Sequence, residues 1–207
     1  MTEPVTNDKP VLSIALSLAA AALLVYAALS PNWLINTSTN DTRSFGLRTY
    51  SECSRWTGLG GDKPTCAEVV RSNTEEVEVI RALGLNAADQ TSSAFAPVGL
   101  IAFVVCFVAA GGLVAGAALV LARKRPELPI APTTIAILAI MVALVTGCVF
   151  VATKPGPTGF VGVGLGFWAF GIGNVLGIAG AQLTAKAIRP RDPDLLADAM
   201  NPDDFPA

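Results

Sequence analysis

The chain has 207 residues; 52% are hydrophobic, only 14% are charged, and the formal net charge is −2. A soluble domain usually carries about 25% charged residues, so this composition argues against a large soluble protein. Histidine is missing altogether, which excludes catalysis or metal binding through an imidazole. No basic stripe lies away from the expected membrane ends, so a nucleic-acid partner is not indicated.

Four segments without a charged residue are long enough to cross a membrane: residues 11–29, 94–122, 130–152 and 160–185. At about 1.5 Å of rise per residue, each covers a hydrocarbon core of roughly 30 Å. The residues before the first segment, 1–10, hold Glu3 and Asp8 and lack the positive region of a secretory signal. We therefore expect the first segment to remain as a helix, in an all-α membrane protein of four transmembrane helices.

The orientation is predicted from the basic residues near the membrane. Residues 123–129 hold three of them and residues 186–207 another three, whereas residues 153–159 hold one. The positive-inside bias predicts a plasma or cytoplasmic membrane protein with both termini and the 123–129 connection in the cytoplasm. The segment 186–207 is rich in acidic residues and proline, and it is expected to be a disordered tail.

Residues 30–93 are therefore expected outside the cytoplasm, beginning with a small antiparallel sheet. Extended segments are predicted at residues 33–38, 44–50 and 53–57, with turn-forming residues between them. The connection at residues 153–159 is expected to be short and to hold no strand.

Helical periodicity is predicted at residues 67–83, with Gly84 as the stop. The carboxylates of Glu75, Glu76 and Glu78 have no identifiable partner in the sequence. We interpret them as one solvated face of this helix.

Cys53 and Cys66 lie in the expected outer loop, where the environment is oxidising. Twelve residues separate them, and a turn between two strands would bring them together. A disulfide closing a loop of this size contributes about 3 kcal/mol in the chain-entropy model. Two unrelated thiols, or a redox-active pair, are the alternatives, although no Cys-x-x-Cys is present. Cys106 and Cys148 are interpreted as small apolar residues within helices.

Small residues recur four positions apart in the second and fourth segments. Such spacing places them on one helix face, where backbones can approach closely in lipid. These ridges either hold the four helices together or bind a second membrane protein. The residues concerned are Gly112 and Gly116, Gly162 and Gly166, and Gly173 and Gly177 with the neighbouring Asn174. No ionisable residue accompanies them in the four segments, which argues against a proton relay or an ion-coupled carrier.

The outer loop resembles that of the claudin superfamily, which includes peripheral myelin protein and the calcium-channel gamma subunits. The resemblance rests on Trp33, on Gly46-Leu47, and on Cys53 and Cys66, between the first two helices of a four-helix membrane protein. It implies a disulfide between the two cysteines across a small sheet in the first extracellular loop.

The function expected from these observations is non-enzymatic. The chain would act by lateral association with itself or with another integral membrane protein, surrounded by membrane lipid and without a metal, cofactor or catalytic residue. A subunit of a small-solute or lipid transporter or channel is the first alternative. A thiol–disulfide enzyme using Cys53 and Cys66 is the second.

Overall fold

The structure is a computed structural model, and it describes residues 8–36, 41–56, 65–82, 92–122, 130–155 and 161–188. The predicted connection at residues 123–129 and most of the predicted tail at 186–207 lie outside the described residues. Four described helices are long and apolar enough to cross a membrane. They are α1 (Asp8–Leu29), α3 (Phe95–Ala122), α4 (Pro132–Ala152) and α5 (Leu165–Ile188).

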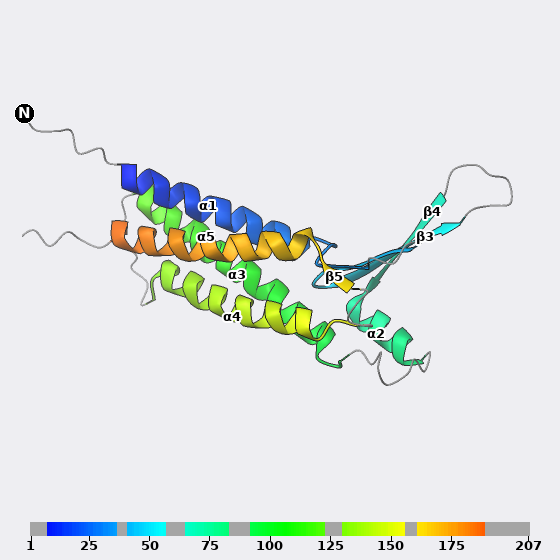
Figure 1. The fold of residues 1–207 in the computed structure, drawn as a ribbon. Coiled ribbons are helices and arrows are strands. Elements are labelled where there is room, and N and C mark those ends of the chain that lie inside the picture. The colour runs from blue at the N-terminus through cyan, green and yellow to red at the C-terminus, as the bar shows by residue number, and fades with distance from the viewer. Residues whose placement is uncertain are drawn as a thin grey trace, which may run out of the picture.

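The four long helices lie side by side in one bundle (Figure 1). The helix pairs α1–α5, α3–α4 and α1–α3 make the most extensive contacts, and α4–α5 pack over a smaller area. The start of α1 and the end of α5 lie at one end of the bundle, and a small sheet extends from the other end (Figure 1). The prediction of a four-helix bundle with a small sheet is confirmed.

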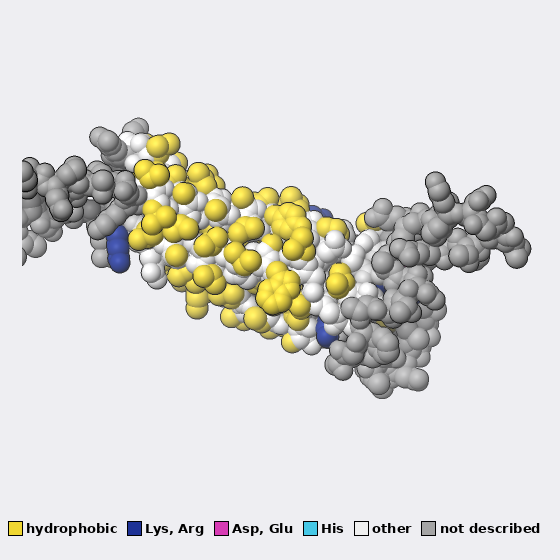
Figure 2. Space-filling model, turned by 45° about the horizontal axis from the view of Figure 1, so that its top comes forward, with side chains coloured by type: hydrophobic (Ala, Val, Ile, Leu, Met, Phe, Trp, Pro, Cys, Tyr) yellow, Lys and Arg dark blue, Asp and Glu magenta, His cyan; other side chains and the backbone are white. Residues whose placement is uncertain are grey.

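Small side chains dominate the interior of the bundle. Several alanines on α1, α3 and α4 are completely buried: Ala20, Ala102, Ala109, Ala136 and Ala143. Large apolar side chains face outward instead, and on α3 they extend from Leu100 to Leu121. On the face seen in Figure 2, hydrophobic side chains cover the bundle along its length, and the basic side chains in view lie toward its ends. Exposing such an apolar surface to water is unfavourable, so the surface is suited to contact with lipid.

The sheet has five strands in the order β4-β3-β2-β1-β5, and every neighbouring pair is antiparallel. The first four strands come from the segment between α1 and α3, and the fifth lies between α4 and α5. They are β1 (Leu34–Asn36), β2 (Asp41–Phe45), β3 (Thr49–Trp56), β4 (Thr65–Ser72) and β5 (Val161–Val163). Strands β4 and β5 are therefore the two edge strands of the sheet.

Strand β5 corrects the prediction that the chain between the third and fourth helices holds no strand. Leu34 is paired with Val163, so β5 extends the sheet beside β1. Gly164 then lies against the backbone of Asn32, where a side chain would not fit. The fourth helix accordingly begins at Leu165 and not at residue 160. Gly162 is a strand residue, and the predicted helix ridge joining it to Gly166 is wrong.

The segment predicted at residues 53–57 belongs, as far as Trp56, to the longer strand β3, and two other predicted elements differ more strongly in their bounds. The expected extended segment at residues 44–50 is interrupted at Gly46-Leu47, where the chain turns from β2 into β3. The expected helix at 67–83 begins later, because residues 67–72 belong to β4 and the described helix is α2 (Asn73–Ala82). The predicted stop at Gly84 lies outside the described residues. Pairing with β3 along the whole of β4 satisfies backbone groups there that a helix would otherwise satisfy.

Reciprocal hydrogen bonds fix the start of α2. The Ser72 backbone N–H donates to the Glu75 carboxylate at 3.0 Å, and the Glu75 N–H donates to the Ser72 hydroxyl at 3.2 Å. This arrangement is a capping box, which satisfies two donors that the first helical turn leaves free. Glu76 corrects the prediction of a solvated acidic face, because it is buried and paired with Arg71.

Candidate functional site

Trp33 occupies the junction between the sheet and the bundle. Its side chain is fully buried, and its indole N–H donates to the carbonyl oxygen of Ala27 in the last turn of α1. The rings of Phe150 and Phe170 lie 5.9 and 4.9 Å from it, centroid to centroid. Gly166 lies directly beside the indole, since a Cβ there would come within 2.6 Å of it. Trp33 therefore joins α1, α4 and α5 to the base of the sheet.

Gly46 and Leu47 form the turn that rests on the bundle next to this tryptophan. The Gly46 N–H donates to the Thr49 carbonyl oxygen at 2.7 Å, which closes the turn between β2 and β3. A Cβ at Gly46 would lie 2.7 Å from the Ser30 carbonyl oxygen, so only glycine fits. The Leu47 side chain is buried, and its carbonyl oxygen lies against Gly99 of α3.

Asn73, the first residue of α2, ties this helix to the same turn. Its side-chain amide donates to the carbonyl oxygens of Gly46 and Leu47 at 3.0 and 3.1 Å. Its backbone N–H donates to the Arg48 carbonyl oxygen at 2.9 Å. The sequence reasoning missed Asn73, although its place after the helix-capping Ser72 was a usable signal.

The backbone places Cys53 on β3 and Cys66 on β4, which are paired strands. In the register, Cys53 lies opposite Glu68 and Cys66 lies opposite Arg55, so the two cysteines are two positions apart along the ladder. Their side chains lie outside what the structure describes, and the disulfide stays a prediction. The motif residues thus divide into a buried group at the junction and a cysteine pair farther out on the sheet.

A network of charged groups covers part of the sheet near α2. Glu52 accepts hydrogen bonds from Arg43 and from the Tyr50 hydroxyl, the latter at 2.9 Å, and its ion pair with Arg43 measures 2.9 Å. Burial, followed by the hydrogen bond to Glu52, raises the pKa of Tyr50. Burial also raises the pKa of Glu76, while Arg71 at 3.4 Å opposes the rise. Within the described residues, no group of three potential metal ligands comes together.

The predicted glycine ridge on α3 is used inside the chain. A Cβ at Gly112 would lie 3.0 Å from Ala136 of α4. One at Gly116 would lie 3.1 Å from Thr133 and 3.3 Å from Thr184. Both glycines therefore allow α3 to approach its neighbours closely.

The ridge on α5 is used in the same way. A Cβ at Gly173 would lie 3.2 Å from Leu23 of α1, and one at Gly177 would lie 2.8 Å from Ile140 of α4. Asn174 beside them is buried; its amide donates to the Phe170 carbonyl oxygen at 2.7 Å, and its side-chain oxygen has no hydrogen-bond partner within the described chain. Of the two interpretations of these ridges, internal packing accounts for all the helical members.

Two other glycines differ from these, because a Cβ at Gly111 of α3 or Gly171 of α5 would meet nothing within 4 Å. Around Gly171 the side chains of Trp168, Ile172 and Val175 are 58%, 53% and 69% exposed. These four residues follow a spacing of three and four, so they share one face of α5. We name this surface the Gly171 face.

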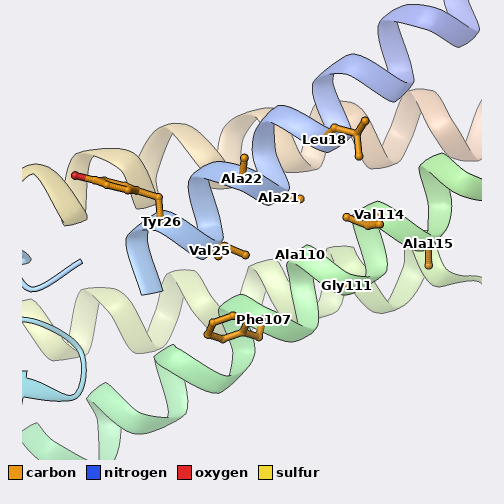
Figure 3. A pocket seen from close by; sticks show the side chains of 10 residues that line it. All are labelled: Leu18, Ala21, Ala22, Val25, Tyr26, Phe107, Ala110, Gly111, Val114 and Ala115. Atoms are coloured by element: carbon orange, nitrogen blue, oxygen red, sulfur yellow. The ribbon is translucent and has the colours of Figure 1, made fainter. Parts of the chain in front are cut away.

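Gly111 lies in a groove between α1 and α3 with a volume of about 860 Å³ (Figure 3). Phe107, Gly111 and Ala115 line the α3 side, and Leu18, Ala22 and Tyr26 are among the residues on the α1 side. Tyr26 and Phe107 lie toward one end, and Leu18 and Ala115 lie toward the other (Figure 3). Tyr26 is three residues before the end of α1, so its end of the groove is nearer the sheet.

Comparison with known proteins adds no functional assignment. No family model and no curated protein matches the sequence. The claudin resemblance carried by Trp33, Gly46-Leu47 and the two cysteines therefore stays a prediction. The Gly171 face and the α1–α3 groove are outward surfaces of the described chain that other molecules can contact.

Proposed function

We propose that this chain is a non-enzymatic, claudin-like membrane protein that acts by lateral association with itself or with another integral membrane protein. The observation that carries the proposal is Gly171. Glycine in a helix interior costs about 1 kcal/mol relative to alanine. At the buried glycines, close packing within the chain offsets this cost, but nothing in the described chain approaches Gly171.

A helix from outside the chain would provide the missing contact at Gly171. Trp168 and Val175 lie on either side of the glycine along α5, and both side chains are exposed. Helices associate in lipid through such close approaches, because lipid itself provides no hydrophobic driving force between them. The side chains of Ile140 and Leu113 fill the space beside Gly177 in the interior of the described bundle. Such close packing supports a structural role.

The orientation belongs to the same proposal. The basic residues at 123–129 and 186–191 favour a plasma or cytoplasmic membrane with both termini in the cytoplasm. The start of α1 and the end of α5 lie at one end of the bundle, and the sheet extends from the other end (Figure 1). With the termini in the cytoplasm, the sheet would lie outside the cell. In that compartment a disulfide between Cys53 and Cys66 would be stable. The burial of Trp33 and Leu47 at one junction supports the claudin-like assignment.

Association can be tested by measuring the mass of the particle released from native membranes in a mild detergent. The wild-type chain should be found in a complex, and Gly171→Leu should release it as a single chain. Val145→Leu is the matched control, because Val145 is 63% exposed on α4 and far along the sequence from the Gly171 face. A solitary wild-type chain, or a complex that survives Gly171→Leu, contradicts the proposal.

The two alternatives make different demands. A transporter or channel subunit requires a path for solute, and Asn174 would be the most polar buried group that the membrane-spanning helices offer it. Loss of flux in reconstituted vesicles on Asn174→Leu would favour this alternative. A thiol–disulfide enzyme requires that Cys53 and Cys66 cycle between the oxidised and reduced states. No described contact favours either alternative over lateral association.

A further inference from the structure

The groove between α1 and α3 is apolar along its length apart from the Tyr26 hydroxyl. Phe107, Gly111 and Ala115 are spaced four apart and form one wall, about 12 Å long at 1.5 Å per residue. The wall begins at Phe107, about 10 Å inside Leu100, the first exposed large apolar residue of α3, and it passes the bilayer midplane near Gly111. An acyl chain of the sheet-side leaflet therefore reaches the sheet-side half of the groove and matches it in polarity.

The positively charged side chain of Arg48 lies near the sheet-side end of the groove, over a ring one helical turn beyond the lining residue Phe107. The guanidinium of Arg48 lies over the ring of Phe103, 4.8 Å from its centroid. The Phe103 ring in turn contacts Phe107, with centroids 5.0 Å apart, and Phe107 lines the groove. The contacts thus run without a break from Arg48 into the groove.

Arg48 is placed to bind an anion. Its side chain is exposed, and neither ion pair among the described residues involves it. Its backbone is held by the hydrogen bond from Asn73 to its carbonyl oxygen. Arginine presents several N–H donors in a planar fork that matches the oxygens of a phosphate.

Arg48 lies near the sheet-side end of the exposed apolar surface of α3. The large exposed apolar side chains of α3 begin at Leu100 and end at Leu121, a length of about 32 Å by helical rise. This length equals the hydrocarbon core of a bilayer, so Phe103 lies one turn inside its sheet-side boundary. The guanidinium, 4.8 Å from the centroid of the Phe103 ring, is therefore within reach of a headgroup at this boundary.

We propose that Arg48 and the α1–α3 groove together form a binding site for one phospholipid of the leaflet on the sheet side. The phosphate binds the Arg48 guanidinium, and the end of one acyl chain lies in the groove between Phe107 and Gly111. Because the Gly171 face does not line this groove, the site is independent of the proposed lateral association.

The test uses native mass spectrometry of the full chain, delipidated in detergent and titrated with phosphatidylglycerol. The wild-type chain should hold one tightly bound lipid, and Arg48→Gln should weaken its binding about tenfold through the lost charged hydrogen bonds. Arg48→Lys should retain most of the binding. Gly111→Leu, which fills the groove without touching Arg48, should weaken binding as well.

Two controls make the outcome specific. Lys154→Gln removes a different basic side chain, at the sheet-side end of α4, and should leave the tight lipid in place. Diacylglycerol, which has the acyl chains but no phosphate, should bind no more tightly to the wild-type chain than to Arg48→Gln. Equal binding of phosphatidylglycerol by the wild-type, Arg48→Gln and Gly111→Leu chains overturns the proposal, as does equal binding of diacylglycerol and phosphatidylglycerol by the wild-type chain.

Discussion

The carbonyl oxygen of Leu47 lies directly against Gly99 of α3, with no side chain between the sheet and the bundle at that point. A Cβ at position 99 would also come within 2.9 Å of the Phe150 ring. We predict that Gly99→Ala lowers the free energy of unfolding by about 1–3 kcal/mol, because the turn or the ring must move. Unfolding of the purified chain in one detergent measures the change.

Gly111→Ala is the matched control for this experiment on the same helix. Nothing lies within 4 Å of the added methyl group, and alanine is the better helix former, so the free energy of unfolding should stay constant or rise by up to about 1 kcal/mol. Equal destabilisation by the two substitutions would contradict the close docking of the sheet at Gly99.

The buried Trp33 should contribute more to stability than Trp168, which is exposed on α5. Replacing a buried tryptophan with alanine costs about 3–5 kcal/mol, so Trp33→Ala should strongly destabilise the chain. Trp33→Phe keeps much of the ring packing but loses the hydrogen bond to Ala27, and we expect a loss of about 1 kcal/mol. Denaturant unfolding of both variants tests this order, with Trp168→Phe, at a position exposed on α5, as a control that should change little.

The pKa values of two adjacent carboxyl groups at the start of α2 should be shifted in opposite directions. The Ser72 hydrogen bonds lower the pKa of Glu75, so its contribution to stability is present above the ordinary glutamate pKa and is lost as the pH falls through the lowered value. Burial raises the pKa of Glu76, so its contribution is present below the ordinary pKa and is lost as the pH rises through the raised value. Carboxyl NMR titration of the two residues checks both signs.

The capping box gives the same region a second test. Ser72→Ala should destabilise α2 by about 1 kcal/mol and move the pKa of Glu75 part of the way back toward its ordinary value, because the hydroxyl is lost while the backbone N–H of residue 72 remains. Thr74→Ala is a control within the same turn and should leave the Glu75 pKa unchanged. An unaltered Glu75 pKa in Ser72→Ala would argue against the reciprocal bonding.

The proposed disulfide can be examined by alkylating intact cells before denaturation and mapping the cysteines by mass spectrometry. We expect Cys53 and Cys66 to be linked and to resist alkylation until a reductant is added. Their linkage would require a local adjustment of the β3–β4 ladder, because the cysteines lie two positions apart in the register. Two freely alkylated thiols would remove the disulfide from the account.

The helices could be predicted from the sequence because lipid imposes a simple rule. Each span must be apolar and long enough, and the four uncharged segments satisfy this condition without reference to any partner. The junction residues Trp33, Gly46 and Leu47 were found through a family resemblance. Their contacts with Ala27 and Gly99 depend on long-range packing that no local pattern reveals.

Strand β5 was missed because Val161-Gly162-Val163 continues an apolar segment and reads as the start of a helix. Only its pairing with Leu34–Asn36, far away in the sequence, makes it a strand. The start of α2 was predicted too early, at residue 67, although Ser72 and Glu75 have the spacing of a capping box and could have placed it. The burial of Glu76 follows from its pairing with Arg71 across the end of β4, which depends on the folded arrangement.

Site-specific photocrosslinking in native membranes tests lateral association most directly. A photoreactive residue at Ile172, on the Gly171 face, should give one discrete protein–protein product. The same residue at Leu138, which is 61% exposed on α4, should give only lipid adducts. Lipid adducts alone at both positions, or the same protein product from both, would contradict the account.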